Sequence, residues 1–486
     1  MTAAPSFEPT ARRSFRSVVR MLWTYPVVAS VLLAAAVGAF VASVPAGFGL
    51  DEAHHIDRAW QVSRGVLEPE TLTPNLQYGG KVPTALVDYV EELGGASNAG
   101  RESGRPLWER DDLALAPDAA ELGRARLSAA SPTTTLDFTN AGAASFVAYA
   151  APALGMRLAT TADLDVHGVL TAAKIANGAL FVAMVACAFV VARRSPYRWL
   201  LLVVALLPET VFQASIVTAD TFTNASALLF VAGVLALRGA QRPAWLTVAA
   251  TVAAGLGMVA AKPTSLLLAG LLLTVPLAAT GGRRAVGWAV RLGGPALIAL
   301  GAAFFTARTS GIADGIRGQV VGWPSIDRHL QLDGLLEHPL RVVGVLARTV
   351  VTFGSSWVEG AIGLLGSNSV FLPEPFVTAV LVLLVLAALR GPRARGAGVV
   401  FVLSALAGVA AVIVALYLTF NPVSAPIASG VQGRYWIPLL VPLLAGVGML
   451  LPVRVRMSDR VAAVTFTAVP ALVLVVALVV WRLTLS

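Results

Sequence analysis

Five titratable side chains stand close together after the first long apolar stretch of the chain: Asp51, Glu52, His54, His55 and Asp57. A carboxylate in this position can accept a proton from a sugar hydroxyl that attacks an anomeric carbon, which is general-base catalysis. Carboxylates and imidazoles also bind divalent metals, although neither the histidine spacing nor a closed ligand set is diagnostic here. Two acids at the start of a helix can simply cap it. The cluster therefore predicts a catalytic site, a metal site or a helix cap.

The residues after Asp51 have the pattern of an amphipathic helix. Ile56, Ala59 and Trp60 fall at i, i+3 and i+4, and Leu67 falls at i+11. A helix with one apolar face next to a membrane span is expected to lie on the outer leaflet. The acidic pair would then stand at the helix N-terminus, near the mouth of the helix bundle.

A second group of polar residues interrupts an apolar region further along the chain. Glu209 stands inside an otherwise apolar run, and Gln213 and Asp220 follow it. An acid at membrane depth is costly, so it usually faces a cavity or a partner. These residues are therefore predicted to line a cavity, with structural pairing as the alternative.

Two cations flank later apolar runs. Lys262 precedes Pro263 in a turn, and Arg434 is followed by Tyr435 and Trp436. Lysine is a compact positive charge, and arginine can bind phosphate oxygens in bidentate fashion. The simpler interpretation is contact with lipid headgroups, and an interfacial aromatic belt for the two rings. The cations are predicted to bind the phosphate of a substrate or of a lipid.

The composition places the chain in a bilayer. Of its 486 residues, 57% are hydrophobic and only 13% are charged, which lies outside the range of soluble domains. The net charge of +9 would suggest nucleic acid for a soluble protein, but many arginines lie in short turns between apolar runs. That distribution is the positive-inside pattern, so nucleic acid is not an expected partner. Cys187 stands alone, which excludes an intrachain disulfide and a cysteine metal cluster.

The apolar runs predict an all-α polytopic membrane protein with about eleven transmembrane helices, because roughly 20 apolar residues cross a bilayer as a helix. Residues 1–22 are expected to be a cytoplasmic segment, and residues 23–486 a single transmembrane domain. No convincing small-residue cleavage site precedes Asp51, so the first span is expected to remain uncleaved. The predicted spans lie near residues 23–45, 169–192, 197–216, 220–238, 243–261, 264–280, 285–307, 374–390, 397–419, 435–452 and 461–482.

The distribution of charge predicts the orientation. If the N-terminus is cytoplasmic, every predicted inner turn carries arginine, in agreement with the positive-inside rule. Of the 27 acidic residues, only Glu8 and Asp459 then lie inside, and all five histidines lie outside. The C-terminus is therefore predicted to be extracytoplasmic.

Two outer loops, residues 46–168 and 308–373, are much longer than the roughly 2 to 8 residues that usually connect helices in bundles. They are expected to carry interfacial helices. Residues 340–366 are apolar enough to cross the membrane but contain Arg341, Arg348 and Glu359. An interfacial or re-entrant segment is predicted there, because a crossing would put the arginines that follow residue 389 outside.

In their order along the chain, several blocks resemble a bacterial family of predicted membrane proteins, domain of unknown function 2142, which is grouped with the glycosyltransferase C superfamily. The resemblance runs over roughly residues 45–450. The matching residues are Asp51-Glu52-Ala53-His54 with Arg58-Ala59-Trp60-Gln61, Leu206-Leu207-Pro208 with Phe212-Gln213-Ala214-Ser215 and Asp220, Lys262-Pro263, and Gln432-Gly433-Arg434-Tyr435.

The resemblance implies a glycosyltransferase C-like fold and an inverting enzyme in the bacterial plasma membrane. Such an enzyme would move a sugar from a polyprenyl-phosphate donor to an extracytoplasmic cell-envelope glycan or glycolipid. Asp51 would be the general base, with Glu52 as the alternate, and Lys262 and Arg434 would stabilise the departing phosphate. No cofactor is certain, and a divalent metal remains possible. The other expected substrate-binding residues are His54, His55, Arg58, Glu209, Gln213, Asp220 and Tyr435.

Two other functions remain open. One is a transporter or flippase of a lipid-linked or anionic solute, with Lys262, Arg434 and Glu209 along its path. Transporters often show internal symmetry or paired broken helices, and neither is evident in the sequence. The other is a non-catalytic scaffold of the cell envelope whose outer loops bind partners.

Overall fold

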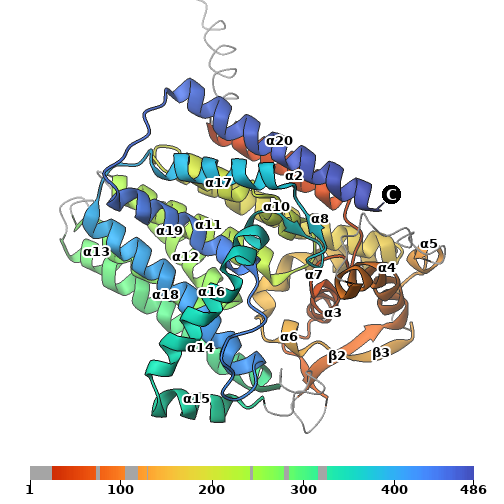
Figure 1. The fold of residues 1–486 in the computed structure, drawn as a ribbon. Helices are drawn as coiled ribbons and strands as arrows, with labels where there is room; N and C mark the ends of the chain where they lie inside the picture. The colour runs from red at the N-terminus through yellow and green to blue at the C-terminus, as the bar shows by residue number, and fades with distance from the viewer. Residues whose placement is uncertain are drawn as a thin grey trace, which may run out of the picture.

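The computed structural model describes residues 25–72, 77–103, 119–128, 130–240, 245–277, 284–315 and 326–485, and helices dominate these residues. Long helices form a bundle, and the first outer loop forms a smaller unit at one end of it (Figure 1). The expected cytoplasmic segment, residues 1–22, lies outside the described residues.

Within the described residues, six helical segments are long and apolar enough to cross a membrane. Each coincides with a predicted span, and a bent pair of helices adds a seventh if it is counted as one. The six are α8 (Val166–Val191), α11 (Ala219–Gly239), residues 285–312 in α13, η5 and α14 (Arg284–Trp288, Ala289–Gly293 and Gly294–Gly315), α18 (Arg395–Phe420), residues 433–450 in η7 and α19 (Gly433–Trp436 and Ile437–Leu450), and α20 (Asp459–Leu485).

The bent pair replaces the single helix predicted at residues 197–216. It consists of α9 (Arg198–Ala205) and α10 (Pro208–Ser215), which meet at 57°. Pro208 explains the break, because proline disfavours helical backbone at the preceding residue and lacks the N–H that would continue the helix. Pro208 therefore already indicated in the sequence that the helix breaks here.

The four remaining predicted spans are apolar helices of 10–17 residues. These lengths fall short of roughly 20 residues, so the number of crossings above seven stays a prediction. The four are α2 (Tyr25–Val41), α12 (Trp245–Ala261), η3 (Pro263–Thr274) and α17 (Glu374–Ala388).

The segment around residues 340–366 is mainly one helix, α16 (Leu340–Ile362), which follows the short α15 (Arg328–Glu337). On one side of α16, Leu340 and Val351 are 84% and 86% exposed. Arg341 and Arg348 instead donate to the backbone carbonyls of Ser424 and Pro426. An exposed apolar side and an anchored polar side support an interfacial helix.

The first long loop, predicted to lie outside, contains strands as well as helices, so the all-α prediction was incomplete. The strands pair in the order β1-β2-β3 and are antiparallel. Their runs of threonine and glycine lack alternating apolar residues, so the pattern did not predict strands. A second, two-stranded sheet joins β4 (Leu364–Leu365) to β5 (Val370–Phe371). The elements of the first loop are α3 (Glu52–Ser63), β1 (Glu70–Thr71), β2 (Tyr78–Pro83), α4 (Thr84–Ser103), α5 (Ala119–Gly123), β3 (Thr133–Asp137), α6 (Thr139–Gly142), η2 (Phe146–Tyr149) and α7 (Ala150–Thr161).

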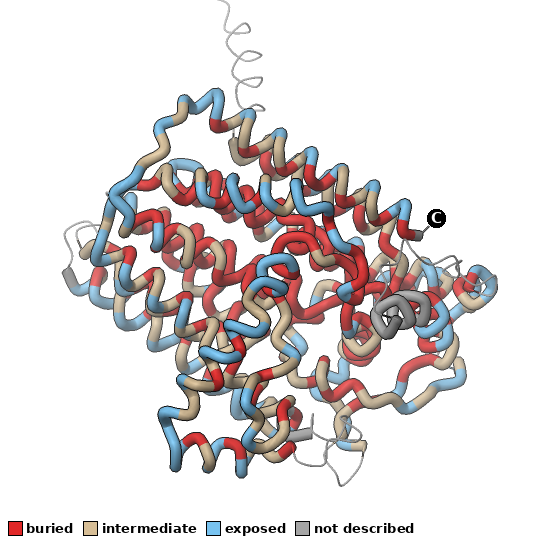
Figure 2. Tube along the Cα trace, viewed as in Figure 1, coloured by how far each residue is buried: buried red, intermediate tan, exposed pale blue. Residues whose placement is uncertain are grey.

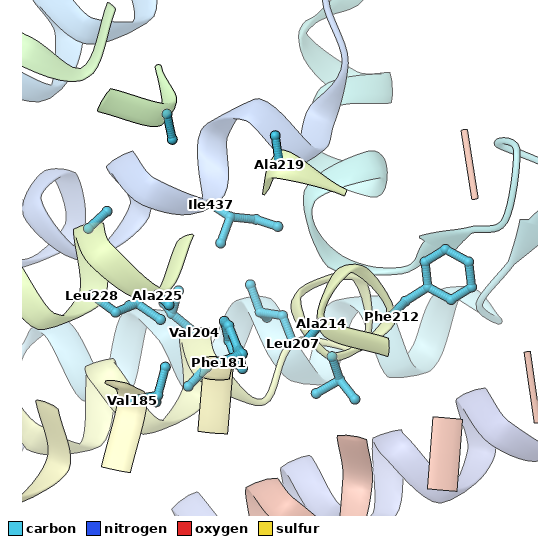
Figure 3. Close-up of a cluster of buried hydrophobic side chains, with 14 of the residues drawn as sticks. Phe181, Val185, Val204, Leu207, Phe212, Ala214, Ala219, Ala225, Leu228 and Ile437 are labelled. Atoms are coloured by element: carbon cyan, nitrogen blue, oxygen red, sulfur yellow. The ribbon is translucent and has the colours of Figure 1, made fainter. Parts of the chain in front are cut away.

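The core of the bundle surrounds α11. Within an apolar stretch of 18 residues in this helix, 83% of the residues are buried. Buried residues concentrate in the middle of the bundle, and the outer helices carry the exposed ones (Figure 2). Side chains from α8, α9, α10, α11 and α19 pack together there (Figure 3). Apolar packing of this kind, together with close approach at small residues, holds helices together in lipid. The polar site stands at one end of this core.

Candidate functional site

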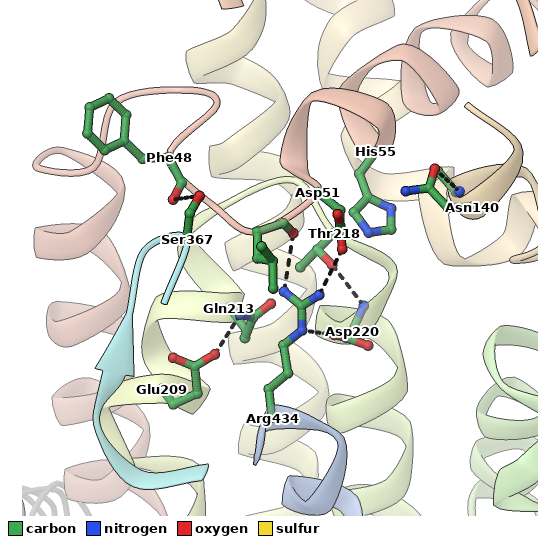
Figure 4. A network of polar contacts seen from close by, with 12 residues as sticks. Phe48, Asp51, His55, Asn140, Glu209, Gln213, Thr218, Asp220, Ser367 and Arg434 are labelled. Carbon is green, nitrogen blue, oxygen red and sulfur yellow. Dashed lines mark hydrogen bonds and ion pairs between the residues drawn. The ribbon is translucent and has the colours of Figure 1, made fainter. Parts of the chain in front are cut away.

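Arg434 is the centre of the polar site and is only 6% exposed. Its Nη1 donates to the carbonyl oxygen of Leu50 at 3.2 Å, and its Nη2 donates to Oδ2 of Asp51 at 3.4 Å. Its Nε lies 3.3 Å from Oδ2 of Asp220 (Figure 4). One guanidinium thus joins the start of α3, the start of α11 and the loop before α19.

Lys262 completes the charged group from a fourth segment. Its ammonium forms an ion pair with Oδ1 of Asp220 and lies 4.3 Å from the centre of the Tyr435 ring. Asp220 therefore bridges the two cations. In total, the formal charges of Asp51, Asp220, Lys262 and Arg434 cancel. The structure thus brings together four of the residues for which the sequence predicted chemistry, although they come from widely separated blocks.

The position of Arg434 depends on a close backbone approach. A Cβ atom on Gly433 would lie 2.4 Å from the carbonyl carbon of Gly360 and 2.5 Å from the carbonyl oxygen of Trp357 in α16. Only glycine fits at this contact, because any side chain would push the loop away from α16. The contact therefore fixes η7, and with it Arg434, against α16.

Asp51 and Glu52 differ sharply in their surroundings. The Asp51 side chain is 41% exposed, and its backbone has a left-handed φ of 61°. Glu52 is 0% exposed, and its two carboxylate oxygens accept from the backbone N–H groups of Gly49 at 2.9 Å and Val217 at 3.0 Å. Burial raises the pKa of Glu52. Glu52 thus ties the start of α3 to the link between α10 and α11, and Asp51 is the acid open to a reactant.

His55 is held in a defined orientation by a residue that sequence reasoning missed. Its Nδ1 lies 2.6 Å from the hydroxyl oxygen of Tyr149, and that hydroxyl donates to the carbonyl oxygen of Ala141 at 3.1 Å. The Tyr149 hydroxyl therefore lies between the imidazole of His55 and the backbone at Ala141. Burial lowers the pKa of His55 to about 4, so the ring is neutral at pH 7.

Two other residues of α3, His54 and Arg58, were also predicted to bind substrate. Nδ1 of His54 is buried and, among the described residues, has no hydrogen-bond partner. Arg58 is 1% exposed and donates to the side chain of Gln61 and to the carbonyl oxygens of Val66 and Leu67. Burial lowers the pKa of Arg58 to about 10. Arg58 therefore holds the loop after α3 and does not join the charged group.

Glu209 and Gln213 lie one turn apart on α10, and both are buried. Nε2 of Gln213 donates to Oε1 of Glu209 at 2.7 Å. Oε2 of Glu209 has no hydrogen-bond partner within the described part of the chain. Figure 4 shows the pair to the left of the Arg434 side chain. These residues place a second polar layer behind the charged group.

A pocket of about 280 Å³ opens beside the charged group. Its polar end includes Asp220, Lys262 and Arg434, and one wall is apolar. The metal-binding prediction gains no support from the geometry: in the ranges that the structure describes, no group of three or more His, Cys, Asp or Glu is placed to hold a metal ion. Other residues that line the pocket include Asn140, Thr223, Asn224, Val412, Leu416, Tyr435, Pro438 and Leu439.

Comparison with known proteins gives one family. The model of a family described as "Predicted membrane protein (DUF2142)" matches residues 34–444, which is most of the chain. No curated protein and no solved structure matches the chain. The matched region includes Asp51, Asp220, Lys262 and Arg434.

Proposed function

The chain belongs to the DUF2142 family of predicted membrane proteins, and we propose that it is an inverting glycosyltransferase. It would move a sugar from a polyprenyl-phosphate donor to an extracytoplasmic cell-envelope glycan or glycolipid. The observation that carries the proposal is an open carboxylate, Asp51, that pairs with Arg434, while Arg434 and Lys262 line a pocket with an apolar wall.

The pocket suits an anionic amphiphile. A lipid-linked sugar has a phosphate, which needs cations, and an apolar chain, which needs an apolar surface. Lys262 and Arg434 provide the charge, and Val412, Leu416 and Leu439 lie on the apolar side of the pocket. Cations held in a partly buried site stabilise a leaving phosphate more strongly than cations in water do.

The reaction then follows from the positions of the charged groups. Asp51 accepts the proton of an acceptor hydroxyl, the hydroxyl oxygen attacks the anomeric carbon, and the bond from that carbon to the phosphate oxygen breaks. The electron pair of this bond remains on the polyprenyl phosphate, where Lys262 and Arg434 stabilise its charge. Attack from the face opposite the phosphate inverts the anomeric configuration.

The ion pair between Arg434 and Asp51 connects donor binding to this step. A carboxylate oxygen that accepts from an arginine is occupied and cannot at the same time accept the proton of a hydroxyl. A donor phosphate that binds Arg434 competes for the same guanidinium N–H groups and so frees Asp51. The contact of 3.4 Å is long, which makes such an exchange easy.

The proposal includes about eleven crossings, a glycosyltransferase C-like fold and a plasma-membrane location with the site outside. Support comes from the basic turns and from the end of α20. There, Nε1 of Trp481 donates to the carbonyl oxygen of Ser43 at 3.2 Å, just before the loop that carries Asp51. Figure 1 shows the C-terminus at the same end of the bundle as α3 and α4.

The test is transfer of a labelled sugar. The purified chain in lipid nanodiscs is mixed with ¹⁴C-labelled polyprenyl-phosphate glucose, galactose, mannose or arabinose, together with octyl glycosides and extracted envelope glycans as acceptors. The proposal predicts labelled product with at least one donor. Absence of product from all donors and acceptors, in a preparation that binds polyprenyl phosphate, contradicts it.

A transporter or flippase is the second candidate, and the 57° bend between α9 and α10 favours it, because transporters build sites at broken helices. The same preparation distinguishes the two functions. A flippase moves a fluorescent polyprenyl-phosphate sugar between leaflets of a liposome without changing it, whereas the transferase consumes it.

A further inference from the structure

The pocket extends beyond the two cations along the first turns of α11. Asp220, Thr223 and Asn224 stand at i, i+3 and i+4, so they share one face of the helix, and all three line the pocket. Lys262 and Arg434 already contact Asp220. Thr223 and Asn224 are therefore the next polar groups that an occupant of the pocket would meet.

The amide nitrogen of Asn224 is buried without a hydrogen-bond partner in the described part of the chain. Its side chain is 2% exposed, and no described group contacts its amide nitrogen within hydrogen-bond distance. Nearly all buried polar groups in proteins are paired, because an unpaired one loses its bonds to water without replacement. Thr223 donates its hydroxyl proton to the carbonyl oxygen of Ala219 at 3.0 Å, which leaves its oxygen free to accept.

The two side chains together offer donors and acceptors. An amide group can donate and accept, and the Thr223 oxygen can accept a further bond. Sugar hydroxyls also donate and accept, so they satisfy both residues at once. Asn140 lines the same pocket and adds another amide, while the ring of Pro438 gives an apolar surface. Alternation of polar groups with a small apolar surface suits a sugar.

The size of the pocket agrees with a single sugar. A volume of about 280 Å³ is near the lower end of the range for small-molecule sites. A prenyl chain of many carbons would not fit inside such a volume, so only its first carbons would lie against Val412, Leu416 and Leu439, and the rest would run outside the pocket. The enclosed part is left for the sugar.

We propose that Asn224 and Thr223 bind the hydroxyls of the donor sugar, while Lys262 and Arg434 bind its phosphate. This assignment rests on the proposed glycosyltransferase function and adds the residues that recognise the sugar. It makes Asn224 the residue on which the preference for a sugar-bearing donor over a bare lipid phosphate depends.

The test compares binding of two kinds of probe to the full chain in nanodiscs. One probe is farnesyl phosphate, and the others are farnesyl-phosphate glucose, galactose, mannose and arabinose. The wild-type chain is expected to bind at least one sugar-bearing probe about tenfold more tightly than farnesyl phosphate, which corresponds to one or two hydrogen bonds. Asn224→Leu should remove this preference and leave the dissociation constant for farnesyl phosphate within about twofold.

Ser226→Ala is the matched control. Ser226 lies on the same helix, is 0% exposed and also has an unpaired hydroxyl, but it does not line the pocket. Its loss should leave the preference unchanged. Asn224→Leu should melt at or above the wild-type temperature, since it removes an unpaired buried amide. If the leucine variant does not fold, Asn224→Ala replaces it with the same expectation for binding.

The outcomes separate the inference from the function on which it rests. A sugar preference that survives in Asn224→Leu or Asn224→Ala overturns the inference and leaves the transferase intact. A wild-type chain that binds farnesyl phosphate but prefers none of the sugar-bearing probes also overturns it, and indicates that water occupies the pocket. A wild-type chain that binds no probe contradicts the proposed function itself.

Discussion

Replacing Asp57 with asparagine is expected to stabilise the protein above pH 7. Asp57 lies in α3 and is 6% exposed. Burial, and then the charge of Glu91, raise the pKa of Asp57 from 3.8 to about 7. In the folded chain this carboxyl is therefore protonated at a pH where the unfolded chain has already lost the proton.

The sign of the effect follows from linkage. A group with a raised pKa in the folded state stabilises the protein fully below its unfolded pKa, and this stability is lost as the pH rises through its folded pKa. The window runs from 3.8 to about 7. At about 1.36 kcal/mol for each pKa unit, the loss reaches about 4 kcal/mol above pH 7, and about 2 to 3 kcal/mol of it falls between pH 5 and pH 8.

The assay is the thermal midpoint of the purified chain in one detergent, measured from pH 5 to pH 8.5. The amide of the variant does not titrate, so the advantage of Asp57→Asn over the wild type should grow with pH and level off above pH 7. Glu91→Gln is the control: it removes the second cause of the raised pKa and should give a smaller change in the same direction. An advantage that stays constant across this range refutes the assigned burial of the charge.

Three further predictions concern topology, the buried acid and the cations. Reporter fusions after Arg242 and at the C-terminus should report opposite sides of the membrane, and matching sides would contradict the predicted orientation. Glu52→Ala should lower the thermal midpoint, because it leaves two buried N–H groups without acceptors at about 1 to 3 kcal/mol each; an unchanged midpoint would show that Glu52 does not anchor α3. Lys262→Gln and Arg434→Gln should each raise the KM for a polyprenyl-phosphate donor, and unchanged donor kinetics in both variants would remove these cations from the site.

The sequence predicted which residues form the charged group, but not which of them pair with one another. Asp51, Asp220, Lys262 and Arg434 each stood out because a charge beside an apolar run is unusual. Their pairing could not be read, since Arg434 and Asp51 are 383 positions apart. Such contacts depend on the packing of the whole bundle.

Other features of the site differ in how far the sequence signalled them. Tyr149 was missed because a lone tyrosine in a loop has no pattern that points to His55. Thr223 and Asn224 were missed although their spacing from Asp220 put all three on one helical face.

For the fold as well, the sequence predicted some features and not others. Hydrophobic runs located the apolar helices, because the bilayer demands them. Pro208 indicates the bend between α9 and α10, whereas hydrophobicity alone predicts one span over residues 197–216. The short strands β1 to β3 were not predictable from pattern, because threonine and glycine pairs in the outer loop carry no alternation of apolar and polar residues.

The most direct test of the general-base mechanism is the rate of sugar transfer by Asp51→Asn. The amide has nearly the shape of the carboxylate but cannot accept the proton, and general-base catalysis typically contributes about 10²- to 10⁴-fold. The variant should keep the wild-type thermal midpoint, because Asp51 is partly exposed and its side chain makes one long contact, with Arg434, among the described residues. It should bind farnesyl phosphate at least as tightly as the wild type, because a neutral amide competes less for Arg434. We expect its transfer rate to fall by at least about a hundredfold. A folded Asp51→Asn chain that transfers sugar at the wild-type rate would contradict the assignment of Asp51 as the base.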